Sequence, residues 1–159
     1  NGIDTFFVDD KRLIRPKKGK IVLLSQSGAI ALAVMEWLSS KNIGVSKIIS
    51  YGNKIDLDEV EILKELKDDQ NSKAIFIYME GLRDGRGKEF LEVVSQLNKP
   101  VIVLKSGKTK RGSVAVSSHT ASMAGDYEVY KNLFKQYNII EAKSMGDFMI
   151  YLKTLAFYL

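Results

Sequence analysis

The chain has 159 residues, of which 45% are hydrophobic and 27% are charged, and this balance predicts a globular protein with one hydrophobic core. It contains no cysteine and a single histidine, which excludes disulfides, thiolate nucleophiles and cysteine-ligated zinc, and we expect no structural metal. The formal net charge of +5 is compatible with an anionic ligand such as phosphate or a nucleotide.

The first residues differ in character from the rest of the chain. Residues 1–4 lack the charged and apolar regions of a secretory signal, and no apolar run approaches the roughly 18 residues of a membrane span. We therefore expect a cytoplasmic protein with no membrane partner. Because the chain opens on Asn rather than Met, we expect a fragment of a longer polypeptide, with a leading segment or linker at residues 1–19 and a domain at residues 20–159.

A basic cluster ends the leading segment. No aromatic residues alternate with it, so we interpret it as a solvated arm and expect no nucleic-acid partner. The cluster consists of Arg12, Arg15, Lys17, Lys18 and Lys20.

Short apolar runs then alternate with amphipathic segments. Residues 21–24 predict a buried strand that ends in a tight turn, and residues 29–38 predict a helix that is apolar on most sides. Residues 47–51 predict the next strand. Asp58, followed by Glu61, predicts a capping-box start for the second helix.

The second half of the chain continues this alternation. Residues 74–79 and 101–104 predict two more strands, and the helix between them ends before Pro100. A fourth helix, a short strand at residues 139–140 and a helix that begins near Ser144 follow, and we interpret the apolar stripe of this last helix as core. The apolar faces of these three helices consist of Phe90, Leu91, Val94 and Leu97; Tyr130, Leu133, Phe134 and Tyr137; and Phe148, Tyr151, Leu152, Leu155 and Leu159.

The alternation predicts a parallel sheet of about five strands with helices on both faces. We expect a flavodoxin-like, doubly wound fold with three α/β/α layers and strand order 2-1-3-4-5. Ligands of such sheets bind beyond the carboxyl ends of the strands, where the order reverses. This order brings residues 25–28, residues 80–81 and the loop that contains His119 to one edge.

His119 lies in a stretch of hydroxyl-bearing and small residues, 117–125. The connection from Lys105 to Gly125 takes about 20 residues where about 2 to 6 are usual, and such long loops are generally functional. A neutral imidazole is a competent nucleophile near neutral pH. We therefore predict that His119 is catalytic, with Ser118, Thr120 and Ser122 supporting it in the loop.

Two other features of the same edge suit phosphoryl transfer. The turn after the first strand offers serine hydroxyls and the free N–H groups of a new helix, whose dipole favours an anion. Glu80 can accept the proton of one histidine nitrogen and leave the other free to attack. The sequence therefore predicts a histidine that takes a phosphoryl group, a carboxylate that fixes its tautomer and a helix start that holds the phosphate. The predicted phosphate-binding residues are Ser25, Gln26, Ser27, Gly28 and Ala29, with Gly52, Asn53 and Gly81 in supporting loops.

Other interpretations use some of the same residues. A serine hydrolase with Ser27 as nucleophile and His119 as base requires glycine where the chain has Ser25. A phosphoacceptor receiver domain requires carboxylates after the first strand and an aspartate after the third, where the chain has Ser25 and Glu80. We interpret the basic residues after the fourth strand as a solvated face rather than as anion-steering groups; they are Lys105, Lys108, Lys110 and Arg111.

Taken in order, these motifs resemble the succinyl-CoA synthetase-like flavodoxin domain of NDP-forming acyl-CoA synthetases, in particular the ADP-forming acetate–CoA ligases. The resemblance runs from about Lys20 to Tyr158. It rests on residues 25–29, 52–54 with 56, 78–81, 99–101 with 105–107, and 118–120 with 124–125.

This resemblance implies reversible conversion of acyl-CoA, ADP and phosphate to a carboxylic acid, CoA and ATP, through an acyl phosphate and a phosphohistidine at His119. Glu80 matches the family's histidine-binding glutamate, and residues 27–29 match the helix start that holds its phosphate. CoA, ADP or ATP, phosphate and magnesium are then substrates held largely by other domains, with no cofactor bound tightly. Ala121 stands where the family commonly has glycine, which narrows the backbone angles of the loop.

The resemblance also implies partners for this domain. The family places CoA on a Rossmann-type domain and the nucleotide on an ATP-grasp domain, in the same chain or another subunit, and the sequence contains neither. We expect the isolated domain to be inactive and the complete enzyme to be an oligomer. Some relatives carry the same module fused to an acetyltransferase and use it to sense acyl-CoA or phosphate, often without the histidine, so His119 favours catalysis over sensing.

Overall fold

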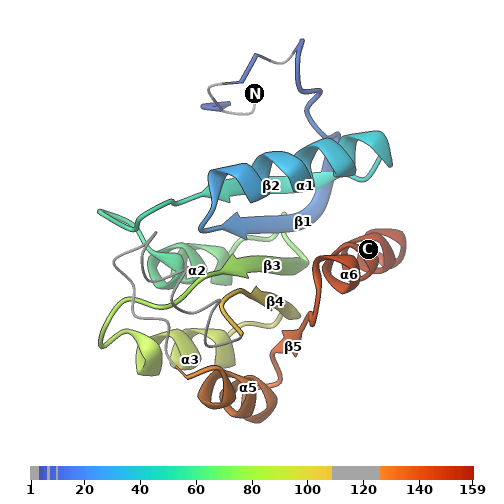
Figure 1. The fold of residues 1–159 in the computed structure, drawn as a ribbon. Coiled ribbons are helices and arrows are strands. Elements are labelled where there is room, and N and C mark those ends of the chain that lie inside the picture. Colours follow the sequence, from blue (N-terminus) through green and yellow to red (C-terminus); the bar gives the residue numbers. More distant parts are fainter. Residues whose placement is uncertain (1–3, 7, 10, 109–125) are drawn as a thin grey trace.

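The computed structural model describes residues 4–6, 8–9, 11–108 and 126–159. In this part of the chain, five parallel strands form one sheet in the order β2-β1-β3-β4-β5 (Figure 1). The predicted order and the flavodoxin-like fold class are therefore confirmed. The strands are β1 (Lys18–Ser25), β2 (Val45–Ser50), β3 (Ala74–Met79), β4 (Val101–Lys105) and β5 (Ile140–Glu141). The helices are α1 (Gly28–Ser40), α2 (Glu59–Lys67), α3 (Gly87–Ser95), α5 (Tyr127–Gln136) and α6 (Met145–Tyr158).

Helices cover both faces of the sheet. Along β1, Val22 and Leu24 point to the face packed by α2, α3 and α5, whereas Ile21 and Leu23 point to the face packed by α1 and α6. Because both faces are covered, the central strands are continuous apolar runs rather than alternating ones. On the second face, the rings of Phe76 and Phe148 meet edge to face with centroids 5.3 Å apart and fix α6 on β3.

Polar side chains begin the helices where the sequence predicts. Asp58 caps α2 by accepting the backbone N–H groups of Val60 and Glu61, at 3.0 and 3.3 Å. The carboxylate of Glu61 bonds Lys64 and Arg86, which is the residue before α3. Ser144 likewise begins α6 by accepting the N–H of Asp147 at 3.1 Å. None of the helices in the described ranges is long and apolar enough to cross a bilayer.

The ends of several elements differ from the predictions. β1 begins at Lys18, so Lys18 and Lys20 are strand residues and the interpretation as an arm is wrong for these two. β2 ends at Ser50, one residue before the predicted end. Leu97 and Tyr137 lie just past the ends of α3 and α5 but still pack against the core, which is why apolar periodicity overruns the true helix ends.

β1 and β2 begin with a close backbone approach. Lys18 pairs with Val45, and the register shifts before Val22. A Cβ atom on Gly19 would lie 2.2 Å from the carbonyl carbon of Gly44, and one on Gly44 would lie 2.4 Å from the carbonyl oxygen of Lys18. Since backbone atoms oppose the added methyl group on both sides, neither glycine can be replaced without movement of the strands.

We expect Gly19→Ala to lower the free energy of unfolding by about 1 to 3 kcal/mol, because the strand ends must separate. Gly87→Ala is the matched control, since nothing lies within 4 Å of a Cβ atom at this first residue of α3. The control should be neutral or stabilise by up to about 1 kcal/mol through helix propensity. Urea denaturation measures both, and equal stability of the two variants would contradict the close approach.

Candidate functional site

The turn between β1 and α1 is shaped by its serines. Ser25 Oγ donates to the carbonyl oxygen of Ser27 at 2.7 Å and accepts the N–H of Ser27 at 3.2 Å. Ser27 is the N-cap of α1, and its Oγ accepts the N–H of Ile30 at 3.4 Å. Gly28 and Ala29 are exposed at the helix start, and the first turn of α1 carries no acidic residue. A helix start of this kind can receive an anion.

Gln26 joins this turn to the end of β3. Its backbone N–H donates to the carbonyl oxygen of Tyr78 at 3.1 Å. Its side-chain Oε1 accepts two further backbone N–H groups, from Glu80 at 2.8 Å and from Gly81 at 3.2 Å. Gln26 is only 4% exposed, so its side chain holds the two loops together from inside. A role for Gln26 in binding phosphate stays a prediction.

Lys105, the last residue of β4, reaches the same point from the other side. Its Nζ donates to the carbonyl oxygens of Glu80 at 2.7 Å and Ser106 at 2.6 Å, and lies 4.9 Å from the centroid of the Tyr130 ring. Lys105 is 1% exposed, so its interpretation as part of a solvated face is wrong. Burial lowers the pKa of Lys105 to about 8, against the opposing effect of the Glu80 carboxylate.

The other basic residues after β4 divide into two groups. Lys108 is partly buried, and its Nζ lies 2.8 Å from a Glu141 carboxylate oxygen and 3.1 Å from the carbonyl oxygens of Ala142 and Lys143. These contacts fasten the start of the long connection to the end of β5. Lys110 and Arg111 lie outside the described residues.

The loop between β2 and α2 contributes a buried ion pair. Lys54, with a φ of 58° and 3% exposure, places its Nζ 2.9 Å from the Glu59 carboxylate and donates to the carbonyl oxygen of Gly81. Burial lowers the pKa of Lys54 and raises that of Glu59, and in each case the partner's charge opposes the shift. The bond from Lys54 to Gly81 links the loop that contains Gly52 and Asn53 to the segment after β3. Lys54 belongs to a motif noted in the sequence, whereas Glu59, in the first helical turn after the Asp58 cap, gives no sequence sign of burial.

Three side chains, from two loops and the end of β4, therefore hold one short piece of backbone, residues 80–81. We call Gln26, Lys54 and Lys105 the peptide clamp, since together they bond the N–H and C=O groups of Glu80 and Gly81. The Glu80 carboxylate is close enough to Lys54 and Lys105 to raise the pKa of both against the effect of burial. The structure thus brings together the predicted turn of residues 25–29, Glu80 and Gly81, and the Gly52–Asn53 loop.

The predicted histidine loop is a separate matter. His119, Ser118, Thr120 and Ser122 lie outside the described residues. The predicted meeting of His119 with Glu80 therefore stays a prediction.

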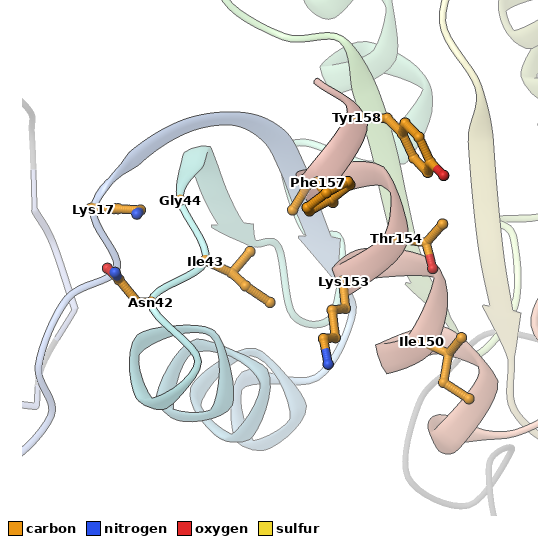
Figure 2. A pocket seen from close by; sticks show the side chains of 10 residues that line it. Lys17, Asn42, Ile43, Gly44, Ile150, Lys153, Thr154, Phe157 and Tyr158 are labelled. Atoms are coloured by element: carbon orange, nitrogen blue, oxygen red, sulfur yellow. The ribbon is translucent and has the colours of Figure 1, made fainter.

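A pocket of about 720 Å³ lies at the opposite edge of the sheet (Figure 2). Lys17, which precedes β1, and Gly44, which precedes β2, line it on one side. Ile150, Phe157 and Tyr158 of α6 line it on the other. Because it sits at the amino ends of the strands, the pocket is distinct from the candidate site at their carboxyl ends.

Comparisons with known proteins assign the chain to a family. Residues 18–155 match the model of the succinyl-CoA ligase-like flavodoxin domain. The chain is 47% identical over 84% of its length to acetate–CoA ligase (ADP-forming) I of Archaeoglobus fulgidus, and 45% identical over 81% to the alpha subunit of acetate–CoA ligase (ADP-forming) I of Pyrococcus furiosus. It covers 20% of the first relative and 28% of the second.

A solved structure supports the same relationship. Acetyl-coenzyme A synthetase 1 of Candidatus Korarchaeum cryptofilum, described as dinucleotide forming and in complex with phosphate and ADP, matches 88% of this chain at 43% identity with a TM-score of 0.83. This chain spans 31% of that protein. The described domain is therefore a minor part of the length of the relatives it matches.

The buried charge of Lys105 predicts a measurable pH dependence of stability. The unfolded chain holds this proton up to the ordinary lysine pKa of 10.5, whereas the folded protein releases it near pH 8. The unfolded state therefore binds more protons between these values, and stability rises with pH across that window. We expect the unfolding free energy of the wild type to rise relative to that of Lys105→Met by roughly 1 to 3 kcal/mol from pH 8 to 10.5.

Denaturant unfolding at several pH values measures this difference. Lys88→Met is the matched control, because the Lys88 side chain is 89% exposed and changes its surroundings little on unfolding. The control should follow the wild type at every pH. If the difference in unfolding free energy between wild type and Lys105→Met were the same at every pH, burial would not lower the pKa of Lys105.

Proposed function

Since the chain belongs to the succinyl-CoA ligase-like flavodoxin domain family, we propose that it is the phosphohistidine-bearing domain of an ADP-forming acyl-CoA synthetase. The reaction converts acyl-CoA, ADP and phosphate to a carboxylic acid, ATP and CoA. The observation that carries the proposal is the junction of the α1 start with Glu80 through the side chain of Gln26. This junction sets an anion-binding helix start beside a partly exposed carboxylate.

In the first step, phosphate displaces CoA from the acyl-CoA and gives an acyl phosphate. The free nitrogen of His119 then attacks the phosphorus, and the bond from phosphorus to the acyl oxygen breaks with its electron pair leaving on the carboxylate. In the last step, ADP takes the phosphoryl group from the histidine and gives ATP. Each step conserves the phosphoryl group, so no oxidant or reductant is required.

The described residues would act on the middle step. Glu80 accepts the N–H of one imidazole nitrogen, which keeps the other nitrogen unprotonated for attack and stabilises the positive ring that forms. The N–H groups at the start of α1 stabilise the charge on the transferring phosphoryl oxygens. The clamp keeps both groups in place before the substrate arrives, so little reorganisation is needed during the reaction.

Partners must supply the rest of the reaction. This chain spans 20% and 28% of the two relatives compared above, which are named as ADP-forming ligases. We therefore assign CoA binding to a Rossmann-type domain and binding of the nucleotide with its magnesium ion to an ATP-grasp domain, in the same chain or in another subunit. The acyl-CoA and the carboxylic acid are the substrates that these domains share with this one.

His119→Asn tests the assignment of the phosphorylated residue. The complete enzyme, incubated with magnesium and ATP labelled at the γ-phosphate, should form a phosphoprotein that is labile to acid and stable to base, because phosphorus is then bonded to nitrogen. We expect no such label in His119→Asn. Label that persists in this variant would refute the assignment, and a wild type that binds acyl-CoA without ever being labelled would favour the sensing function.

Glu80→Gln tests the orienting carboxylate. We expect phosphorylation to slow by about 10- to 100-fold, as for other groups that fix a histidine tautomer. The fold should persist, because the clamp bonds the backbone of residue 80 and not its carboxylate. Rapid-quench measurement of labelling gives the rate, and Glu92→Gln, which changes an exposed glutamate of α3, is the control. An unchanged rate in Glu80→Gln would remove Glu80 from the mechanism.

A further inference from the structure

We propose that Lys105 is a positioning residue, which holds the carbonyl oxygen of Glu80 and thereby directs the Glu80 carboxylate toward the α1 turn. This inference rests on the proposed function, in which Glu80 orients the phosphorylated histidine. Lys105 itself need not touch the substrate, since it acts through the backbone of residue 80.

Lys105 and the residues around it hold the segment that follows β3 at several points. Its Nζ bonds the carbonyl oxygen of Glu80, and its charge lies over the ring of Tyr130. The Tyr130 hydroxyl in turn accepts the N–H of Leu82 at 3.2 Å. The N–H of Ser106, next to Lys105, donates to the carbonyl oxygen of Met79 at 2.9 Å. The backbone on both sides of Glu80 is therefore held by Lys105, Tyr130 and Ser106.

The Cα–Cβ bond of Glu80 lies between two backbone groups of that residue, its N–H and its carbonyl, and both are hydrogen-bonded. Gln26 holds the N–H of Glu80, and Lys105 holds its carbonyl oxygen. Rotation about the Glu80 backbone would break one of these bonds, so the direction of its Cα–Cβ bond is set. If Lys105 no longer holds this carbonyl, the Gln26 bonds to the N–H groups of Glu80 and Gly81 and the Lys54 bond to Gly81 remain, and the direction of the Glu80 side chain is less tightly set. A shift of about 1 Å at a reacting group is enough to slow a reaction by about 100-fold.

Stability alone does not account for a lysine at this position. Lysine is almost never fully buried unless it is paired with an opposite charge, and burying its ammonium is costly. Lys54 has such a partner in Glu59, 2.9 Å away. The hydrogen bonds of Lys105 within the described ranges go to carbonyl oxygens instead. The low pKa of Lys105, about 8, indicates that its surroundings disfavour the charge. An apolar side chain would avoid burying a charge but would leave the carbonyl oxygens of Glu80 and Ser106 without this donor, so the benefit of the lysine lies in what its ammonium holds.

Lys105→Met in the complete enzyme tests this inference. Methionine is similar in length but donates no hydrogen bond, and we expect labelling by γ-labelled ATP to slow by about 10- to 100-fold. Lys99→Met is the matched control, because Lys99 also bonds backbone carbonyl oxygens, those of Leu66 and Asp69, but at the amino end of β4. The control should keep the wild-type rate. Lys105→Gln, which keeps an N–H donor, should recover part of the loss and serves if the methionine variant does not fold.

A double-mutant cycle separates positioning from a general structural effect. If Lys105 acts through Glu80, Lys105→Met should slow the wild type but slow Glu80→Gln no further. Equal slowing in both backgrounds, or a wild-type rate in Lys105→Met, would overturn the inference while leaving a slow Glu80→Gln and the proposed function intact. A wild-type rate in Glu80→Gln would overturn the inference and remove Glu80 from the mechanism, while the labelling of His119 would still test the proposed function.

Discussion

The side-chain oxygen of Gln26 links the β1–α1 turn to the loop after β3, beyond the last residues at which these two strands are paired. The last paired residues of β1 and β3 are Ser25 and Tyr78. Beyond these residues the two segments diverge, because α1 packs on one face of the sheet and α3 on the other. This divergence would leave the N–H groups of Glu80 and Gly81 without strand partners, and Gln26 Oε1 accepts both. One side chain therefore links the two loops at the reversal of strand order.

The same divergence explains why two lysine side chains are buried at the carboxyl ends of the strands. Carbonyl oxygens that leave the sheet need donors as much as N–H groups do. The long side chains of Lys54, in the loop after β2, and Lys105, at the end of β4, reach those of Gly81 and Glu80. Burial lowers the pKa of both lysines, which is a cost to the fold. Both ammonium groups lie near the Glu80 carboxylate, at the edge of the sheet that also carries the start of α1. A cost to stability at this place is consistent with a site built for an anion.

The sequence predicted what depends on local pattern and failed where long side chains cross between elements. Alternating apolar runs sufficed for the strand order, because covered parallel sheets leave few topologies. Asp58 and Ser144 marked helix starts correctly, since a cap acts within three residues. Lys105 was misjudged because its bonds run to Glu80, 25 positions away in the chain. The burial of Glu59 was missed for a similar reason, since it depends on where the turn at Lys54 points.

The proposed reaction makes opposite demands on Glu80 and on His119. Glu80 is held at one point, which suits the step in which the histidine takes the phosphoryl group. Delivery to a nucleotide on another domain requires the histidine to leave that point. In the proposed reaction this movement falls to the connection from Lys105 to Gly125, which takes about 20 residues. Lys108 anchors the connection at Glu141 as it leaves the sheet. The clamp thus holds the residue that accepts the imidazole N–H, and in the proposed second step it is the histidine, not Glu80, that changes place.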